Sequence, residues 1–206
     1  MTTIYLIRHA KPDFRIHNDM ERPLTEEGKQ SCSRVTEFLM GKKITHVYSS
    51  PYKRAMDTIK EFAMVKRHSV EAVYDLRERA VDEGWIENFS EFVHSQWKDF
   101  DYKLEGGESL REVEARCVPA LEAILRENPE GNIVIGSHGT VISTIIHYYD
   151  NAFGVEHFNL IRNIMPFVAK LKFDHTDCKL IEILDILGNM EQKLYERILA
   201  STQKCL

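Results

Sequence analysis

The sequence contains little glycine and proline, which interrupt helices and strands, and little cysteine, which can cross-link a chain. Its 206 residues include only 10 glycines, 6 prolines and 4 cysteines. This composition, with no low-complexity tract and no internal repeat, excludes collagen-like and disordered chains. Cys32, Cys117, Cys178 and Cys205 are scattered and form neither a CxxC pair nor a zinc-finger pattern with histidine. We therefore expect four reduced structural thiols.

Long apolar runs and an excess of positive charge are also missing. No apolar segment reaches the roughly 18 residues that a membrane span requires, and the first residues lack the pattern of a signal peptide. The formal net charge is −5, from 27 Lys plus Arg against 32 Asp plus Glu. Such a chain gains little from nucleic acid or an anionic membrane. We expect a cytoplasmic protein that binds neither of them.

Short β-branched and aromatic runs alternate with segments of helical periodicity. This alternation predicts a single α/β domain over residues 1–206, with helices on both faces of a sheet. The expected strands are 3–8, 44–50, 69–74, 131–137, 166–174 and 179–186, and the expected helices are 25–40, 50–64, 109–125, 140–149 and 190–201. Residues 75–108 have no clean periodicity, so they predict an irregular excursion with one short helix over the pocket. Residues 188–206 form the expected terminal helix and tail.

Three expected helices begin with a capping signal. Thr25 is a favourable N-cap, and Ser109 with Glu112 three residues later matches a capping box. Ser50 followed by Pro51 is typical of an N-cap and first helical residue. These signals place the start of each helix directly after a loop or strand end.

Chemically active residues gather where three of the expected strands end. Arg8 and His9 follow the first strand, Arg54 lies in the first turn of the helix after the second, and His138 and Gly139 follow the strand at 131–137. Catalytic groups of α/β folds collect at the carboxyl ends of strands. Two arginines and two histidines beside exposed helix N–H groups would bind a dianion.

Phosphoryl transfer is the chemistry that these residue types favour. Imidazole is a competent nucleophile when one ring nitrogen is free and the other is held by a hydrogen bond. Glu78, just after the strand at 69–74, could protonate the leaving oxygen and then activate water. Each group alone is typical of an ordinary structural or surface residue. Their shared position at strand ends is what favours a site.

Six blocks of the sequence, in order, resemble those of a known family: "LIRHA", "RPLTEEG", "YSSPYKRAMDT", "DLRER", "GGESLREVEARCVPALEAI" and "IVIGSHGTVI". Together they resemble the histidine phosphatase superfamily, the phosphoglycerate-mutase-like proteins, over about residues 3–186. The resemblance implies a three-layer α/β/α sandwich around a mixed, mostly parallel sheet. It also implies no metal or organic cofactor, and a small phosphorylated molecule as substrate.

The resemblance assigns a role to each residue of the predicted site. His9 would be the phosphorylated nucleophile, and Arg8 and Arg54 would grip the transferred phosphate. His138 would be the second histidine at the phosphate, and Glu78 the proton donor. The "GWIEN" segment begins six residues after Glu78 rather than close behind it, so Glu83 is the alternative acid.

The segment after the nucleophile departs from the commonest family pattern. Ala10, Pro12 and Arg15 stand where that pattern has Gly, a hydroxyl residue and an Asn that binds phosphate. Arg15 and Lys11 are the candidates to replace this Asn. Residues 18–28 resemble the short branch that includes protein phosphohistidine phosphatases, whereas "LRER" and "GGESL" resemble the mutase and broad-specificity phosphatase branch.

The leading hypothesis is a metal-independent phosphatase of phosphate monoesters that works through phosphohistidine at position 9. True mutases of this type carry longer insertions that cap the pocket, so the chain length favours hydrolysis. Mutase-type phosphoryl transfer, phosphohistidine hydrolysis and a non-catalytic phospholigand-binding or protein-binding role remain alternatives. A metal-dependent hydrolase is disfavoured because no HExxH or comparable spacing occurs. Nothing in the sequence indicates an oligomer, although the terminal helix offers a surface for one.

Overall fold

A seven-stranded mixed sheet forms the centre of the molecule. The computed structural model describes residues 1–81, 88–188 and 191–199. Within them the strand order is β3-β2-β4-β1-β5-β6-β7. The pairings among β3, β2, β4 and β1 are parallel, and those from β1 to β5, β6 and β7 are antiparallel. Five of these strands therefore run in one direction, and β5 and β7 oppose them.

Most elements lie where the sequence pattern predicts them. The strands are β1 (Thr2–Arg8), β2 (Ile44–Ser49), β3 (Val70–Ala72), β4 (Gly131–Ser137), β5 (Phe167–Asp174), β6 (Asp177–Asp185) and β7 (Gln192–Ile198). The helices are α1 (Glu26–Met40), α2 (Lys53–Lys66), α3 (Phe89–Lys98), α4 (Leu110–Glu127), α5 (Gly139–Tyr149) and α6 (Val155–Ile161), with a 3-10 turn η1 (Tyr74–Leu76). The short helix α6 was not predicted from the sequence.

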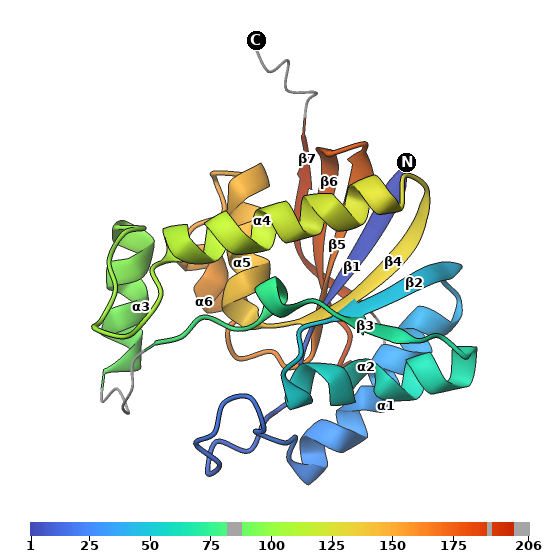
Figure 1. Cartoon of the computed structure of the whole chain (residues 1–206), viewed down its shortest axis with the longest axis horizontal. Coiled ribbons are helices and arrows are strands. Elements are labelled where there is room, and N and C mark those ends of the chain that lie inside the picture. The colour runs from blue at the N-terminus through green and yellow to red at the C-terminus, as the bar shows by residue number, and fades with distance from the viewer. Residues whose placement is uncertain (82–87, 189–190, 200–206) are drawn as a thin grey trace.

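Helices cover both faces of the sheet, which confirms the three-layer sandwich. Side chains of α4 and α5 pack with alternate residues of β1, β4, β5 and β6 in the larger core. On the other face, α1 and α2 contribute Phe38 and Phe62 to a second core with Tyr5 and Val134. Figure 1 shows α4 crossing one face of the sheet while α1 and α2 lie on the other. The strands that carry the predicted site are thus buried on both faces and held rigidly.

Two of the three predicted helix caps are confirmed. The Thr25 hydroxyl accepts the Gly28 N–H at 3.0 Å, and Ser109 and Glu112 form the reciprocal capping box of α4. The prediction for α2 was wrong, because that helix begins at Lys53 with Tyr52 as its N-cap. The Ser50 hydroxyl accepts the Tyr52 N–H at 3.3 Å in the turn before the helix and is also hydrogen-bonded to the imidazole of His138 at 2.7 Å.

The predicted terminal helix was also wrong, because residues 192–198 form strand β7. β7 pairs antiparallel with the open edge of β6. Leu194 and Tyr195 pack against the larger core, and the Tyr195 hydroxyl donates a hydrogen bond to the buried carboxylate of Asp150. The unpaired edge of β6 and an aromatic anchor therefore outweigh the helical propensity of this polar segment.

The excursion expected at 75–108 contains one short helix, α3, and the unpredicted 3-10 turn η1 begins just before it at Tyr74. Phe92 and Val93 of α3 form a small apolar cluster with Phe158 of α6, and Trp97 packs against that cluster and the larger core. Figure 1 shows α3 at the end of the molecule near α6, away from α1 and α2. Glu83 lies outside the described residues.

The anchor of β7 predicts a loss of stability in the Tyr195→Phe variant. The change removes the Tyr195 hydroxyl from the buried carboxylate of Asp150, which keeps only the Ala152 N–H at 3.2 Å and the Arg197 guanidinium at 3.6 Å, and this loss should lower the free energy of unfolding by about 1–3 kcal/mol. Burial, and then its bond to Asp150, raises the pKa of Tyr195, so the phenol remains a donor at neutral pH. Urea denaturation measures the effect. The control Tyr148→Phe, at a more exposed tyrosine, should change stability little; equal stability of Tyr195→Phe and wild type would contradict the assignment.

Candidate active site

The three predicted strand ends meet at one edge of the sheet. β4 lies between β1 and β2 in the parallel half, and the register pairs Arg8 with Ser137 and Ser49 with Gly136. The residues that follow these strands therefore emerge side by side. Two backbone hydrogen bonds extend the pairing past the strand ends, from the His9 N–H to the Ser137 carbonyl at 3.0 Å and from the Ser50 N–H to the Gly136 carbonyl at 2.8 Å.

His9 is buried at the centre of this edge, and a backbone contact orients its ring. Its Nδ1 lies 2.8 Å from the carbonyl oxygen of Ala10. Because a carbonyl can only accept, Nδ1 must carry the proton and Nε2 keeps its lone pair. Burial, followed by the charges of Arg54 and Arg8, holds the pKa of His9 well below its usual range. The ring is therefore a neutral imidazole with a free Nε2 at neutral pH.

The loop that carries His9 is tied to α2 through Thr58. The Thr58 hydroxyl accepts the Ala10 N–H at 2.9 Å and donates to the Arg54 carbonyl at 2.7 Å. This single buried hydroxyl couples the backbone after β1 to the first turn of α2. Sequence reasoning missed it, because a threonine within a helix carries no signal for such a contact.

The guanidinium of Arg8 lies against the N-terminus of α5. Its Nη1 donates to the carbonyls of Ile161, Arg162 and Ile164 at 2.8–3.0 Å, while its buried Nε has no partner among the described residues. A Cβ at Gly139 would stand 3.1 Å from the guanidinium carbon, so glycine permits this approach. Burial lowers the pKa of Arg8 to about 10, which still leaves it charged at neutral pH.

His138 caps the end of β4 and faces His9. The two ring centroids are 5.2 Å apart. Nε2 of His138 is hydrogen-bonded to the Ser50 hydroxyl, and its buried Nδ1 has no partner among the described residues. Burial, and then the charges of Arg54 and His9, holds the pKa of His138 well below its usual range. A second neutral imidazole thus lies beside the first.

Arg54 enters the site from α2 and is paired with Asp19. Its Nη1 donates to the Asp19 carbonyl at 2.5 Å, and its guanidinium lies 3.2 Å from the Asp19 carboxylate. Arg22 shares that carboxylate through an ion pair of 2.6 Å. The charge of Arg22 also contributes to the lowered pKa of His9. Arg22 is therefore a member of the cationic cluster that sequence reasoning missed, although it opens the "RPLTEEG" block.

The two proposed replacements for the missing Asn point toward other partners. Lys11 forms an ion pair of 2.5 Å with Glu27 at the start of α1. Arg15 binds Asp13 through two nitrogens, and its side chain is 88% exposed, against 14% for Arg22. The structure thus brings Arg22, rather than Lys11 or Arg15, together with Arg54.

Glu78 lies at the edge of the site between η1 and α5. Its carboxylate accepts the N–H of Arg79 at 2.9 Å and the N–H of Thr140 at 3.4 Å. Thr140 is in the first turn of α5, next to Gly139 and His138. The charge of Glu78 also opposes the lowering of the pKa of Arg8. The half-buried Glu78 thus adjoins the cationic cluster, as the sequence predicts.

The arrangement suits an anion with several oxygens. Three arginines and two neutral histidines surround one edge of the sheet, and the N-terminus of α5 adds its positive dipole end. Among residues 1–81, 88–188 and 191–199, no group of three or more His, Cys, Asp or Glu could hold a metal ion. In the same part of the chain, no helix is both long and apolar enough to cross a membrane.

Comparisons with known proteins point to one family and one fold. The family model "Histidine phosphatase superfamily (branch 1)" matches residues 4–185. The "Phosphoglycerate mutase-like protein 4" of Arabidopsis thaliana is 32% identical over 158 residues, which cover 69% of this chain and 68% of the relative. A "Probable phosphoglycerate mutase GpmB" of Salmonella choleraesuis is 28% identical over 161 residues, which cover 71% and 74%.

Two solved structures share the fold at low sequence identity. The mycobacterial glucosyl-3-phosphoglycerate phosphatase superposes with a TM-score of 0.69 at 19% identity, over 82% of this chain and 89% of its own. A phosphoserine phosphatase mutant of Entamoeba histolytica in complex with phosphoserine superposes with a TM-score of 0.67 at 20% identity, over 86% and 94%.

The buried histidines predict a characteristic dependence of stability on pH. Because the pKa values of His9 and His138 are lowered in the folded state, the unfolded chain binds protons first as pH falls. Stability is therefore fully present above about pH 6.5 and decreases below it, by up to about 1.4 kcal/mol per pH unit for each histidine. Urea denaturation of His138→Gln and wild type at pH 7 and pH 5 measures this term. An unchanged pH dependence in the variant would refute it, and His46→Ala is a matched control outside the site.

The cationic cluster predicts a difference between two arginines in anion binding. Arg22→Gln removes a charge beside Arg54 and should weaken binding of inorganic phosphate about tenfold, the value of one charge-assisted hydrogen bond. Arg15→Gln removes the same charge from an exposed pair with Asp13 and should change affinity by less than about twofold. Isothermal titration calorimetry with phosphate distinguishes them. Equal losses would exclude a specific contribution of Arg22.

Proposed function

The chain belongs to the histidine phosphatase superfamily, and from that membership we propose that it hydrolyses phosphate monoesters through a phosphohistidine on His9. The observation that carries the proposal is the hydrogen bond from Nδ1 of His9 to the Ala10 carbonyl. This bond leaves the lone pair on Nε2 of a ring whose pKa is lowered first by burial and then by the charges of Arg54, Arg8 and Arg22. A neutral, oriented imidazole beside an anion-binding site is the arrangement that nucleophilic attack on phosphorus requires.

In the first step, Nε2 of His9 attacks phosphorus and the bond to the leaving oxygen breaks. Glu78 donates its proton to that oxygen, so a neutral alcohol departs. Arg8, Arg54 and His138 stabilise the charge on the remaining phosphoryl oxygens. Gly139 allows Arg8 to lie across the start of α5, where the backbone N–H groups add their dipoles.

In the second step, the Glu78 carboxylate takes a proton from water, and the resulting hydroxide attacks phosphorus. The P–N bond breaks and inorganic phosphate leaves. His9 then recovers its lone pair on Nε2, and Glu78 is again protonated for the next cycle. One carboxyl group thus serves as acid and then as base, so protons balance over the cycle.

Small phosphorylated metabolites are the substrates that we propose. The names of the structural neighbours include phosphatases of phosphoserine and of a glucosyl phosphoglycerate, and both molecules are phosphate monoesters of alcohols. The curated relatives carry phosphoglycerate mutase names, so mutase-type transfer from phospho-His9 is the second candidate. Hydrolysis and transfer share the first step and differ in whether water or an alcohol accepts the phosphoryl group.

Replacement of the nucleophile tests the proposal. His9→Ala should lower the hydrolysis of p-nitrophenyl phosphate at least about a thousandfold, because the covalent route is lost. His94→Ala, at an exposed histidine of α3, is the matched control and should retain wild-type activity. Steady-state kinetics on both variants, with the fold checked by circular dichroism, gives the answer. A folded His9→Ala enzyme with full activity would rule out this mechanism.

A further inference from the structure

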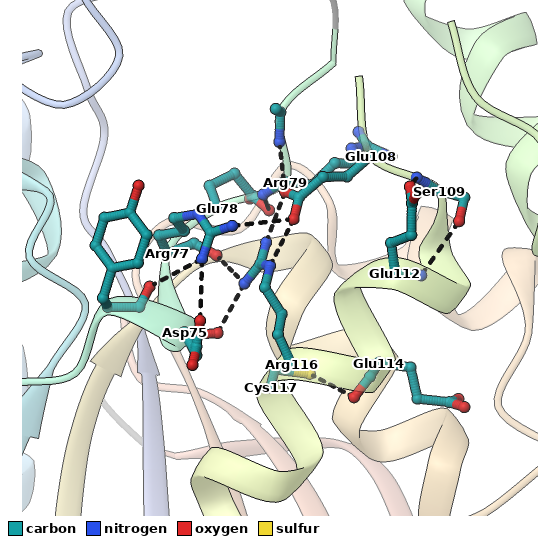
Figure 2. Close-up of polar contacts among 12 residues, drawn as sticks. Asp75, Arg77, Glu78, Arg79, Glu108, Ser109, Glu112, Glu114, Arg116 and Cys117 are labelled. Carbon is teal, nitrogen blue, oxygen red and sulfur yellow. Dashed lines mark hydrogen bonds and ion pairs between the residues drawn. The ribbon is translucent and has the colours of Figure 1, made fainter. Parts of the chain in front are cut away.

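A carboxylate and a guanidinium at the entrance of α4 form a two-pronged contact beside Glu78. Arg116 donates from Nε and Nη2 to the two carboxylate oxygens of Glu108, at 2.7 and 2.9 Å. Figure 2 shows this pair next to the segment that carries Glu78. We call Glu108 and Arg116 the acid-loop clamp. It belongs neither to the three strand ends nor to the cationic cluster.

The clamp holds the backbone on both sides of Glu78. The remaining nitrogen of Arg116, Nη1, donates to the carbonyls of Asp75 and Arg77 at 2.7 and 2.9 Å. The Glu108 carboxylate accepts the N–H of Ala80 at 3.0 Å. The segment is therefore fixed before and after Glu78.

Residues 107 and 108 approach the same segment through the backbone. The Glu108 N–H donates to the Ala80 carbonyl at 2.8 Å. A Cβ at Gly107 would stand 2.2 Å from the carbonyl oxygen of Val81, a contact that no side chain could relieve. Glycine at 107 is thus required for this close approach, which gives "GGES" a physical meaning.

The clamp is a partly buried ion pair. The side chains of Glu108 and Arg116 are 17% and 10% exposed. Burial alone would raise the pKa of Glu108, but hydrogen bonds from Arg116 and from the Ala80 N–H lower it overall. Arg77 adds an ion pair of 3.2 Å to the same carboxylate. A charged, bidentate and multiply bonded group of this kind permits little movement.

We propose that Glu108 and Arg116 are positioning residues that hold the Glu78 carboxyl where the leaving oxygen departs. This inference rests on the proposed function, in which Glu78 is the acid. The carboxylate of Glu78 accepts only backbone N–H groups among the described residues, so its place depends on its backbone. Loosening the clamp would displace the proton donor without touching His9 or the arginines around it.

The dependence of the loss on the leaving group distinguishes a positioning role from a purely structural one. A purely structural role would lower kcat/KM equally for all leaving groups. A leaving oxygen of high pKa needs the acid, whereas p-nitrophenolate departs readily without it. Arg116→Lys keeps the charge but cannot make the fork, so it should lower kcat/KM for an alkyl phosphate such as glycerol phosphate about tenfold or more. For p-nitrophenyl phosphate the same variant should lose less than about threefold. The value of kcat/KM depends only on the steps up to the departure of the leaving group. A slower hydrolysis of the phosphohistidine therefore does not affect the comparison.

Four further variants complete the test. Glu78→Gln should show the same selective loss, and adding Arg116→Lys to it should cause no further loss, because the two changes act through one group. Glu108→Gln should repeat the pattern and replaces Arg116→Lys if that variant fails to fold. Arg111→Lys makes the same substitution on α4 at an exposed ion pair with Asp101, and should leave the ratio of the two substrates unchanged.

The outcomes separate this inference from the mechanism on which it rests. Equal losses of Arg116→Lys or Glu108→Gln on both substrates, in folded protein, would overturn the positioning role. Additive losses in the double variant would overturn it as well. Full activity of His9→Ala would instead overturn the proposed phosphohistidine mechanism, whatever the clamp variants show.

Discussion

The parallel pairing of β2, β4 and β1 is the constraint on which the rest of the site depends. Parallel neighbours end at the same edge of a sheet, and the register here places Arg8 beside Ser137 and Ser49 beside Gly136. The buried strands leave no freedom to slip, because a shift of one residue would turn their apolar side chains to the wrong face. His9 and His138 are therefore brought together by the hydrophobic core rather than by any attraction between them.

The electrostatics of the edge follow from that crowding. Burial, reinforced by the charge of Arg54, lowers the pKa of His9 and of His138, so both imidazoles remain neutral, while the lowered pKa of Arg8 still leaves that guanidinium charged. Backbone carbonyls after α6 and the carboxylate of Asp19 offset part of the cost of burying the two arginines. A bound phosphate dianion would supply the negative charge that these arginines still lack. The same burial that weakens the folded state at low pH thus prepares a nucleophile and an anion site together.

The sequence predicts this fold well where one local signal decides, and poorly where distant contacts compete. Thr25 and Ser109 cap helices as predicted because their partners lie three residues away. Ser50 does not cap α2, because its hydroxyl bonds the Tyr52 N–H in the turn before the helix and His138, which lies within reach only after the sheet has formed. Residues 192–198 have a polar, helix-like pattern, yet the open edge of β6 and the buried Asp150 draw them into a strand.

The candidate site divides in the same way. Arg8, His9, Arg54, Glu78 and His138 could be found because strand ends mark their position. Arg22 and Thr58 could not, since their contacts depend on how the loop after β1 folds back on α2. Glu108 lies in the "GGES" block and Arg116 lies 8 residues further along, but their contacts with residues 75–80 appear only in three dimensions. The sequence therefore indicates the residues that would do the chemistry, but not the residues that hold them in place.

The position of the phosphoryl group on the trapped enzyme tests the central claim most directly. The protein would be mixed with a phosphate monoester, quenched rapidly in alkali, and analysed by peptide mass spectrometry and phosphorus NMR, which distinguishes the two phosphohistidine isomers. The account predicts one phosphorylated residue, His9, modified at Nε2, since Nδ1 is occupied by the Ala10 carbonyl. Phosphate at Nδ1, or on any residue other than His9, would contradict it.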